Sequence, residues 1–184
     1  MEGPHKVFKG YDVPEVCSDS SIVNKLFLST SYMQMRSTHA SIFKGGSLML
    51  GYRNSPYVYY GFGVKYGYTW YHFDNEWYLH HLKFLPVFVF VRLNFMKDRM
   101  VTPYFHLATG ITFASYQKED KHTIGHPYTV SEQGLYLNSG FGCAFKIHRH
   151  FTPFLEAGFQ GFHMSFNQLA VNPHGVNLQV GVLW

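Results

Sequence analysis

The stretch VYYGFGVKYGYTW (58–70) alternates between two kinds of residue, and this alternation decides the fold. The positions from Val58 to Trp70 that share one face are apolar or aromatic, whereas the other face holds mainly glycine, with Lys65 and Thr69. Successive side chains of a β-strand point to opposite faces, so a period of two predicts a strand with one apolar face.

The same alternation recurs along the chain and places eight strands, near 25–36, 40–52, 57–71, 77–95, 102–117, 133–147, 151–166 and 175–184. Each segment reaches the roughly 9–11 residues that a tilted membrane strand needs. Tight polar turns follow the even-numbered strands, and mostly longer connections follow the odd-numbered ones, as in barrels with short periplasmic turns. We therefore predict an all-β fold, an eight-stranded antiparallel up-and-down transmembrane β-barrel over 23–184, after an irregular N-terminal leader at 1–22.

The composition supports a surface that water does not cover. Aromatic residues make up 19% of the chain and charged residues only 14%, against about 25% charged residues in an ordinary soluble domain. A spanning helix needs about 20 consecutive apolar residues, and the longest apolar run, 84–91, is interrupted by Pro86. The net charge of +4 forms no basic stripe, so we predict no nucleic-acid partner.

The two faces of the strands suggest which side meets lipid. Small residues on one face suit the crowded interior of an eight-stranded barrel, so we predict that the aliphatic face is outside. A soluble barrel with the faces reversed remains an alternative, as does a soluble or membrane barrel that holds a hydrophobic ligand in its lumen. We expect the charges on the inward face to pair in the lumen as a plug, because an unpaired charge there is costly; these are Lys65, Arg92, Lys146 and Glu156.

Three phenylalanines fall on the same inward face of the fourth strand. Phe84, Phe88 and Phe90 flank Pro86. They either fill the lumen or are turned outward by a bulge near the proline. The N-terminus MEGPHKVFKG has no apolar stretch typical of a signal peptide, so we expect that a signal was removed and that Met1 is an added or mis-assigned start.

The last strand, GVNLQVGVLW (175–184), carries an outward row that ends on Val180, Val182 and Trp184. This row resembles the C-terminal insertion signal of outer-membrane barrels. Segments 85–95, 101–114 and 175–184 are similar to the hairpins of small outer-membrane β-barrel domain proteins of Gram-negative bacteria. The resemblance implies a bacterial outer-membrane location and contact with outer-membrane lipid and lipopolysaccharide. We predict a structural or interaction role without enzymatic activity, in which the outer loops 118–132 and 167–174 present a surface or contact a protein partner.

An enzymatic alternative rests on His163, Met164 and Ser165, which resemble the His-x-Ser motif of the lipid A 3-O-deacylase family. That resemblance implies an acyl-ester hydrolase in which the histidine activates the serine as a nucleophile. Asn177 stands where the family has its acidic residue. Strand alternation turns His163 and Ser165 outward but Asn177 inward, so the three side chains are not expected to meet.

The histidines and cysteines show no spacing typical of a metal site, and we predict neither a metal nor a cofactor. Several of the twelve histidines fall in or near predicted outer loops, where we expect solvated side chains; these are His72, His122, His126 and His174, with His80 and His81 close by. Cys17 and Cys143 lie far apart in the sequence and suggest no disulfide framework.

Overall fold

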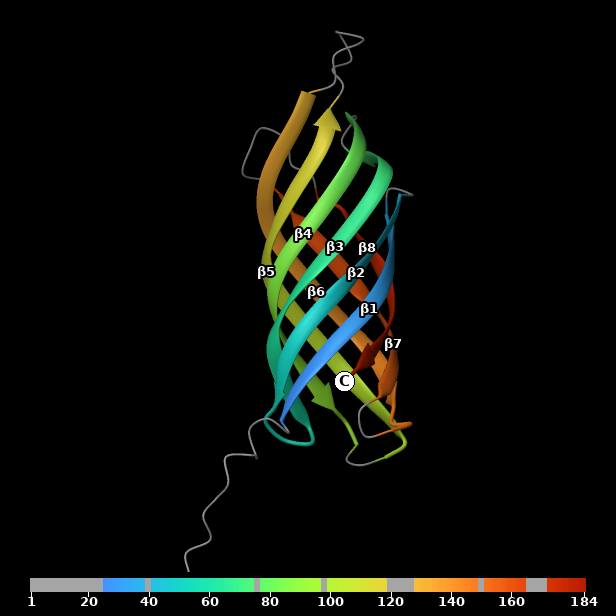
Figure 1. Cartoon of the computed structure of the whole chain (residues 1–184). Helices are drawn as coiled ribbons and strands as arrows, with labels where there is room; N and C mark the ends of the chain where they lie inside the picture. The colour runs from blue at the N-terminus through green and yellow to red at the C-terminus, as the bar shows by residue number, and fades with distance from the viewer. Residues whose placement is uncertain are drawn as a thin grey trace, which may run out of the picture.

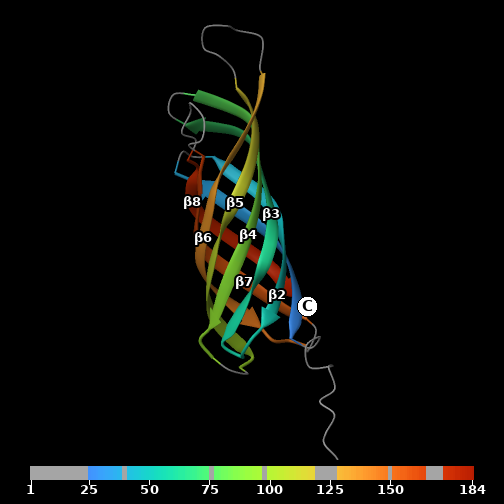
Figure 2. The same cartoon turned by 90° about the vertical axis from the view of Figure 1, so that its left-hand side faces the viewer.

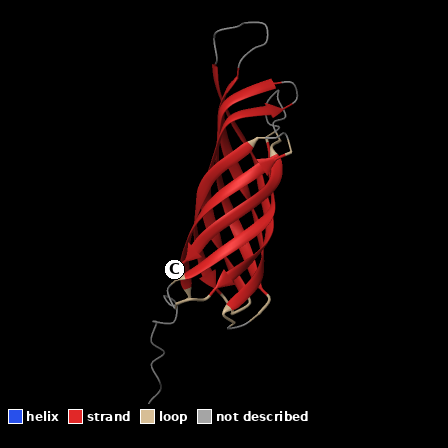
Figure 3. Cartoon of the chain, turned by 90° about the vertical axis from the view of Figure 1, so that its right-hand side faces the viewer, coloured by secondary structure: helices blue, strands red, loops and turns tan. Residues whose placement is uncertain are grey.

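The computed structural model describes residues 25–38, 41–74, 77–96, 99–118, 128–148, 151–164 and 172–184, and the leader predicted at 1–22 lies outside them. The strands are β1 (Leu26–Ser37), β2 (Ile42–Arg53), β3 (Val58–Asp74), β4 (Trp77–Asn94), β5 (Val101–Lys118), β6 (Tyr128–Phe145), β7 (Thr152–His163) and β8 (His174–Leu183). All neighbours pair antiparallel, and β8 pairs with β1, so the eight strands close into a barrel (Figures 1 and 3). The predicted fold is confirmed.

The described part of the chain contains no helix long and apolar enough to cross a membrane.

The two ends of the barrel differ. One end, called the terminus end below, carries Lys25, Trp184 and the turns that follow the even-numbered strands. At the opposite end, the loop end, β3 to β6 run past the other strands (Figure 2). The connections that we expected at 73–76 and 118–132 are therefore shorter in the structure than predicted. Their flanking residues pair as strands, with Asp74 opposite Trp77 and Lys118 opposite Tyr128.

The predicted faces are confirmed by exposure. Phe62, Val89 and Phe141 are 58%, 60% and 65% exposed on the outer wall. The row of β8 from Val176 to Trp184 also faces outward. A continuous apolar outer wall of this kind is what a barrel presents to lipid.

The lumen is filled by aromatic rings towards the loop end. Phe84 stacks on Phe162 with ring centroids 4.4 Å apart and an interplanar angle of 7°. Phe43 lies 5.4 Å from Phe84, and Tyr136 lies 5.5 Å from Phe162. The three phenylalanines of β4 thus point inward: Phe84, Phe88 and Phe90 are each at most 4% exposed.

A bulge interrupts β4, but not near Pro86, which pairs regularly with Thr112. The register between β4 and β5 shifts between His80 and Lys83 instead, and His81 has a positive φ of 54°. A bulge adds one residue to a strand and so changes which side chains face inward beyond it. The extra residue changes which side chains of β4 face the lumen on the loop-end side of His81.

His72 is a second correction, because we expected it in a solvated loop. It belongs to β3 and is completely buried. Its Nδ1 lies 3.0 Å from Ser41 Oγ, and its ring is 5.6 Å from that of Phe43. The strand continues further than expected, and its alternation changes between Thr69 and His72, because Trp70 and Tyr71 are both exposed; His72 therefore faces the lumen.

Candidate functional site

A buried charged cluster closes the lumen towards the terminus end. Arg92 on β4 lies over the ring of Tyr104 on β5, with its guanidinium carbon 3.4 Å from the ring centroid. Tyr104 donates a hydrogen bond of 3.2 Å from its hydroxyl to Glu156 Oε2 on β7. His106 Nδ1 lies 3.0 Å from Glu156 Oε1. All four side chains are at most 6% exposed, so Glu156 is the shared anion of the cluster.

Two glycines on β6 leave room for the cluster to extend along the inside of the barrel wall from β5 to β7. Gly142 pairs with both Tyr104 and Glu156, and Gly140 pairs with His106. A Cβ atom added at Gly142 would collide with the Tyr104 ring and would lie 2.5 Å from its hydroxyl oxygen. Glycine is therefore required where the tyrosine passes over β6 to reach Glu156.

A second polar layer contains Lys65, Gln160, Asn138 and Asn177. Lys65 donates a hydrogen bond of 2.9 Å to Gln160 Oε1, and Asn177 donates one of 2.8 Å to Asn138 Oδ1. Lys65 Nζ also lies 5.4 Å from the centroid of the Tyr136 ring. Lys65 and Arg92 are both close enough to Glu156 to interact electrostatically with it. Lys65, Arg92 and His106 thus lie in the part of the lumen that holds the Glu156 carboxylate.

Little space remains inside this network. The cavity between Phe90, Tyr104, His106 and Glu156 measures about 10 Å³, the lower limit for one water molecule. An eight-stranded barrel has an interior just wide enough for its own side chains or one small ligand. Here side chains occupy that space, which argues against a hydrophobic ligand carried at this level.

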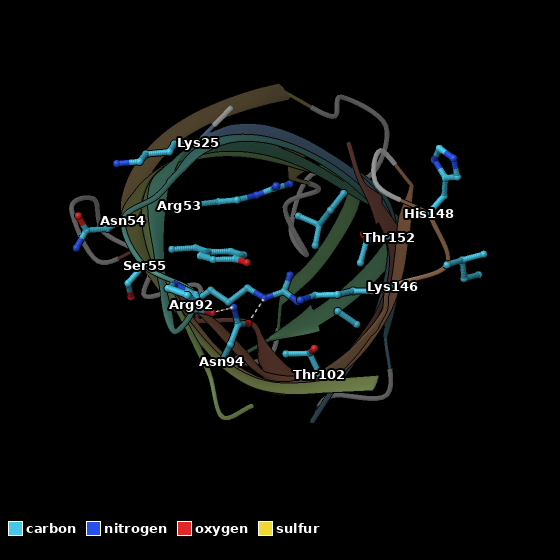
Figure 4. Close-up of a pocket in the computed structure, with 15 residues that line it drawn as sticks. Lys25, Arg53, Asn54, Ser55, Arg92, Asn94, Thr102, Lys146, His148 and Thr152 are labelled. Atoms are coloured by element: carbon cyan, nitrogen blue, oxygen red, sulfur yellow. Dashed lines mark hydrogen bonds between the residues drawn. The ribbon is translucent and has the colours of Figure 1, made fainter. Parts of the chain in front are cut away.

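Below the cluster, the terminus end opens into a cavity of about 630 Å³, called the vestibule (Figure 4). Arg53 and Arg92 extend into it, and Asn94 lies beside Arg92. Arg92 Nε donates a hydrogen bond of 3.3 Å to Asn94 Oδ1. The described residues that line the vestibule include several basic side chains and no carboxylate; the basic ones are Lys25, Arg53, Arg92, Lys146 and His148.

Lys146 corrects the predicted set of lumen charges. It follows the end of β6, is exposed, and lines the vestibule instead of the lumen core. The inward face of β6 would have carried it, but the strand ends at Phe145, and the chain turns towards β7. Lys65, Arg92 and Glu156 lie inside, each at most 6% exposed.

The residues of the deacylase-like motif are not brought together in the described part of the chain. His163 ends β7 with its side chain exposed, and Asn177 is completely buried on the opposite face of the wall. Ser165 lies outside the described residues, as do positions 119–127 and 167–171 of the predicted loops 118–132 and 167–174. Asn177 is therefore a lumen residue, as its alternation predicted.

The described residues contain no group of three or more histidine, cysteine, aspartate or glutamate side chains that could hold a metal ion. Cys143 is a free thiol on β6, and Cys17 lies outside the described residues, as do His122 and His126. Of the loop histidines, His174 opens β8, with its Nδ1 2.8 Å from the Asn172 carbonyl oxygen.

Sequence reasoning missed Arg53, Tyr104 and His106 as members of the site. Arg53 was placed in a turn, yet its guanidinium carbon lies within 5.9 Å of the ring centroids of Phe27 and Tyr59. Alternation along β5 puts Tyr104 and His106 on one face, but their contacts with Glu156 depend on the register of three strands. Gly140 and Gly142 on the inward face of β6 were the only sequence signal that large side chains of β5 extend past β6.

Comparison with known proteins places this architecture in a class. No family model and no curated protein matches the chain. Solved structures do: the N-terminal β-barrel domain of Pseudomonas aeruginosa OprF is 18% identical, with 86% of this chain and 97% of that chain covered and a TM-score of 0.50. Neisserial surface protein A is 16% identical over 86% and 94%, with a TM-score of 0.52.

The outer membrane enzyme PagL is 12% identical, with 83% of this chain and 97% of that chain covered and a TM-score of 0.55. At such identities the similarity concerns the fold. The chain has the fold of the small eight-stranded outer-membrane β-barrels.

Proposed function

We propose that this chain is a small barrel of the bacterial outer membrane with a structural or partner-binding role, closed to diffusion through its lumen. The observation that carries the proposal is the charged cluster of Arg92, Tyr104, His106 and Glu156. It fills the interior inside an apolar outer wall. A conducting barrel needs a continuous water path, and eight strands rarely leave one.

The outer wall supports the membrane location. On β8, Val176, Leu178 and Val180 are each at least 50% exposed, as is Trp184 directly after the strand. Leaving so many large apolar side chains in water would be costly, because each buried one contributes about 1.5–3 kcal/mol. Export to the outer membrane and assembly through the C-terminal row remain part of the proposal.

Two measurements on the refolded protein test it. We expect solubility only with detergent and a gel mobility that changes on heating, as a folded barrel unfolds. In a planar lipid bilayer we expect no steady conductance. A monodisperse protein without detergent would refute the membrane location, and a stable open channel would refute the closed lumen.

The vestibule is the described surface best suited to an anionic group of a periplasmic partner. Arg53 Nε is buried without a hydrogen-bond partner, and the lining is basic. Titration with tripolyphosphate should show binding that is weakened by Arg53→Gln and unchanged by Arg36→Gln on the outer wall. If both variants bind tripolyphosphate equally well, the vestibule is not the anion-binding surface. Partner contacts at the loop end, which we expected at 118–132 and 167–174, remain a prediction, although 128–132 belong to β6 and His174 opens β8.

A lipid A acyl-ester hydrolase is the second candidate, favoured by the exposed position of His163 at the end of β7. Incubation with lipopolysaccharide, followed by mass spectrometry of the lipid A, tests it. Loss of an acyl chain that requires both His163 and Ser165 would establish the hydrolase. Because Asn177 points into the lumen, we expect Asn177→Ala to leave any such activity unchanged.

A further inference from the structure

A hollow on the outer wall near the loop end is lined by basic and aromatic side chains. This wall groove spans β1 to β5 and measures about 890 Å³. Gly45 and Gly46 also line it, and because they have no side chains the surface is hollowed there. Tyr32, Tyr66 and Trp70 border it and are 51%, 47% and 70% exposed.

Two lysines stand on either side of this groove. Lys44 on β2 pairs with Tyr68 on β3, and Tyr68 pairs with Lys83 on β4. Neighbouring strands lie about 4.8 Å apart, so the backbones of the two lysines are roughly 10 Å apart. Both lysines are exposed, and the described residues that line the groove include no carboxylate. An anion between the lysines would meet two cations and no like charge.

The aromatic wall beside the lysines is held in one arrangement. Tyr68 OH lies 3.1 Å from His81 Nδ1, and the Trp70 ring is 5.0 Å from the His81 ring and 5.3 Å from that of Tyr68. His81 is the residue of the β4 bulge with positive φ. A backbone strained in this way persists only where its surroundings hold it, and such strain clusters at functional sites.

The groove lies where the apolar wall ends. Closer to the terminus end, the same strands expose Leu48, Phe62, Val64, Leu85 and Val87, each at least 41% exposed. At the row of Lys44, Tyr68 and Lys83 the outer wall becomes polar and aromatic, as barrels do at the lipid headgroups. The loop end carries the connections after odd-numbered strands, which face the cell exterior in such barrels.

We propose that the wall groove binds a phosphate group of lipid A in the outer leaflet. Lys44 and Lys83 bind the phosphate oxygens. Tyr32, Tyr66 and Trp70 pack against the sugar and the first methylenes of the acyl chains. The inference rests on the proposed outer-membrane location, since only that leaflet offers this lipid.

Native mass spectrometry of the folded barrel in detergent tests the groove, with bisphosphorylated lipid A, dephosphorylated lipid A and phosphatidylglycerol as separate probes. We expect bisphosphorylated lipid A to bind best. Lys44→Gln and Lys83→Gln should each weaken it about fivefold, as expected for one basic residue near an anionic surface. Arg99→Gln, at an exposed position of the terminus end, is the matched control and should leave binding unchanged.

Three outcomes would overturn the inference: equal binding after dephosphorylation, no effect of the two lysine variants, or a preference for phosphatidylglycerol. Heating the same samples before electrophoresis shows that each variant is folded, so a misfolded variant cannot be read as lost binding. If the barrel needs detergent but binds lipid A equally well with and without its phosphates, the proposed phosphate site is refuted and the membrane location is not. A barrel soluble without detergent refutes the membrane location itself.

Discussion

Glu156→Gln should cost this barrel much of its stability, although the substitution barely changes the shape of the side chain. Glu156 accepts a hydrogen bond from Tyr104 and lies 3.0 Å from His106. Lys65 and Arg92 are buried in the same lumen, and their positive charges act on it electrostatically. Glutamine keeps one acceptor oxygen but removes the negative charge that offsets the buried cations around it.

The magnitude follows from the burial of the partners. Removing one partner of a buried ion pair costs about 3–5 kcal/mol. Glutamine retains one hydrogen bond to the cluster, so we take the lower limit, about 3 kcal/mol. This corresponds to a roughly 100-fold loss in the ratio of folded to unfolded protein. Urea unfolding in detergent micelles, followed by tryptophan fluorescence, measures this difference.

Glu132 supplies the matched control, because it is also a buried carboxyl in the lumen, 6% exposed. It accepts a hydrogen bond of 2.9 Å from the neutral Tyr116 hydroxyl, so Glu132→Gln should cost at most about 1 kcal/mol. Adding Arg92→Met to Glu156→Gln should recover part of the loss, since the unpaired cation is then gone. Equal losses for Glu156→Gln and Glu132→Gln, or no recovery, would refute the reasoning.

Three further substitutions test other parts of the structure. Gly142→Ala should lower the free energy of unfolding by about 1–3 kcal/mol through overpacking. Gly161→Ala, where the nearest atom to a new Cβ is 3.7 Å away, should not; equal urea midpoints would contradict the packing argument. Phe84→Ala should cost about 3–5 kcal/mol because it opens a void beside a stacked ring, whereas Phe62→Ala on the lipid face should cost less in the same urea titration. Trp184→Ala should lower the fraction of heat-modifiable barrel recovered from cell membranes, and unchanged recovery would argue against the C-terminal row as an insertion signal.

The alternation of side chains was sufficient to predict the barrel and its two faces, because both depend only on neighbours within one strand. It placed Lys65, Glu156 and Asn177 inside without any knowledge of their partners. What it could not supply was register. The contact between Tyr104 and Glu156 spans 52 positions and depends on Gly142 lying between them on β6.

The same limit explains the errors near the loop end. The bulge at His81 changes which residues of β4 face inward, and no glycine or proline at that position marks it in the sequence. His72 and the ends of the long hairpins were misplaced because polar residues there continue the strands. Alternation reports a strand reliably only while its period stays at two.

The interior charges have a consequence for how the barrel reaches one structure. A slip of one residue in strand pairing moves every side chain to the other face. For β3 or β4 such a slip would turn Lys65 or Arg92 towards lipid, at about 2–4 kcal/mol each near the membrane midplane, and would bring outward residues such as Val64 into the lumen. An apolar lumen would resist such a slip far less, because an apolar side chain costs little on either face. The buried charges therefore disfavour wrong strand registers even where they add little net stability. The same charges fill the lumen, so the specificity of the register and the closure of the lumen have one cause.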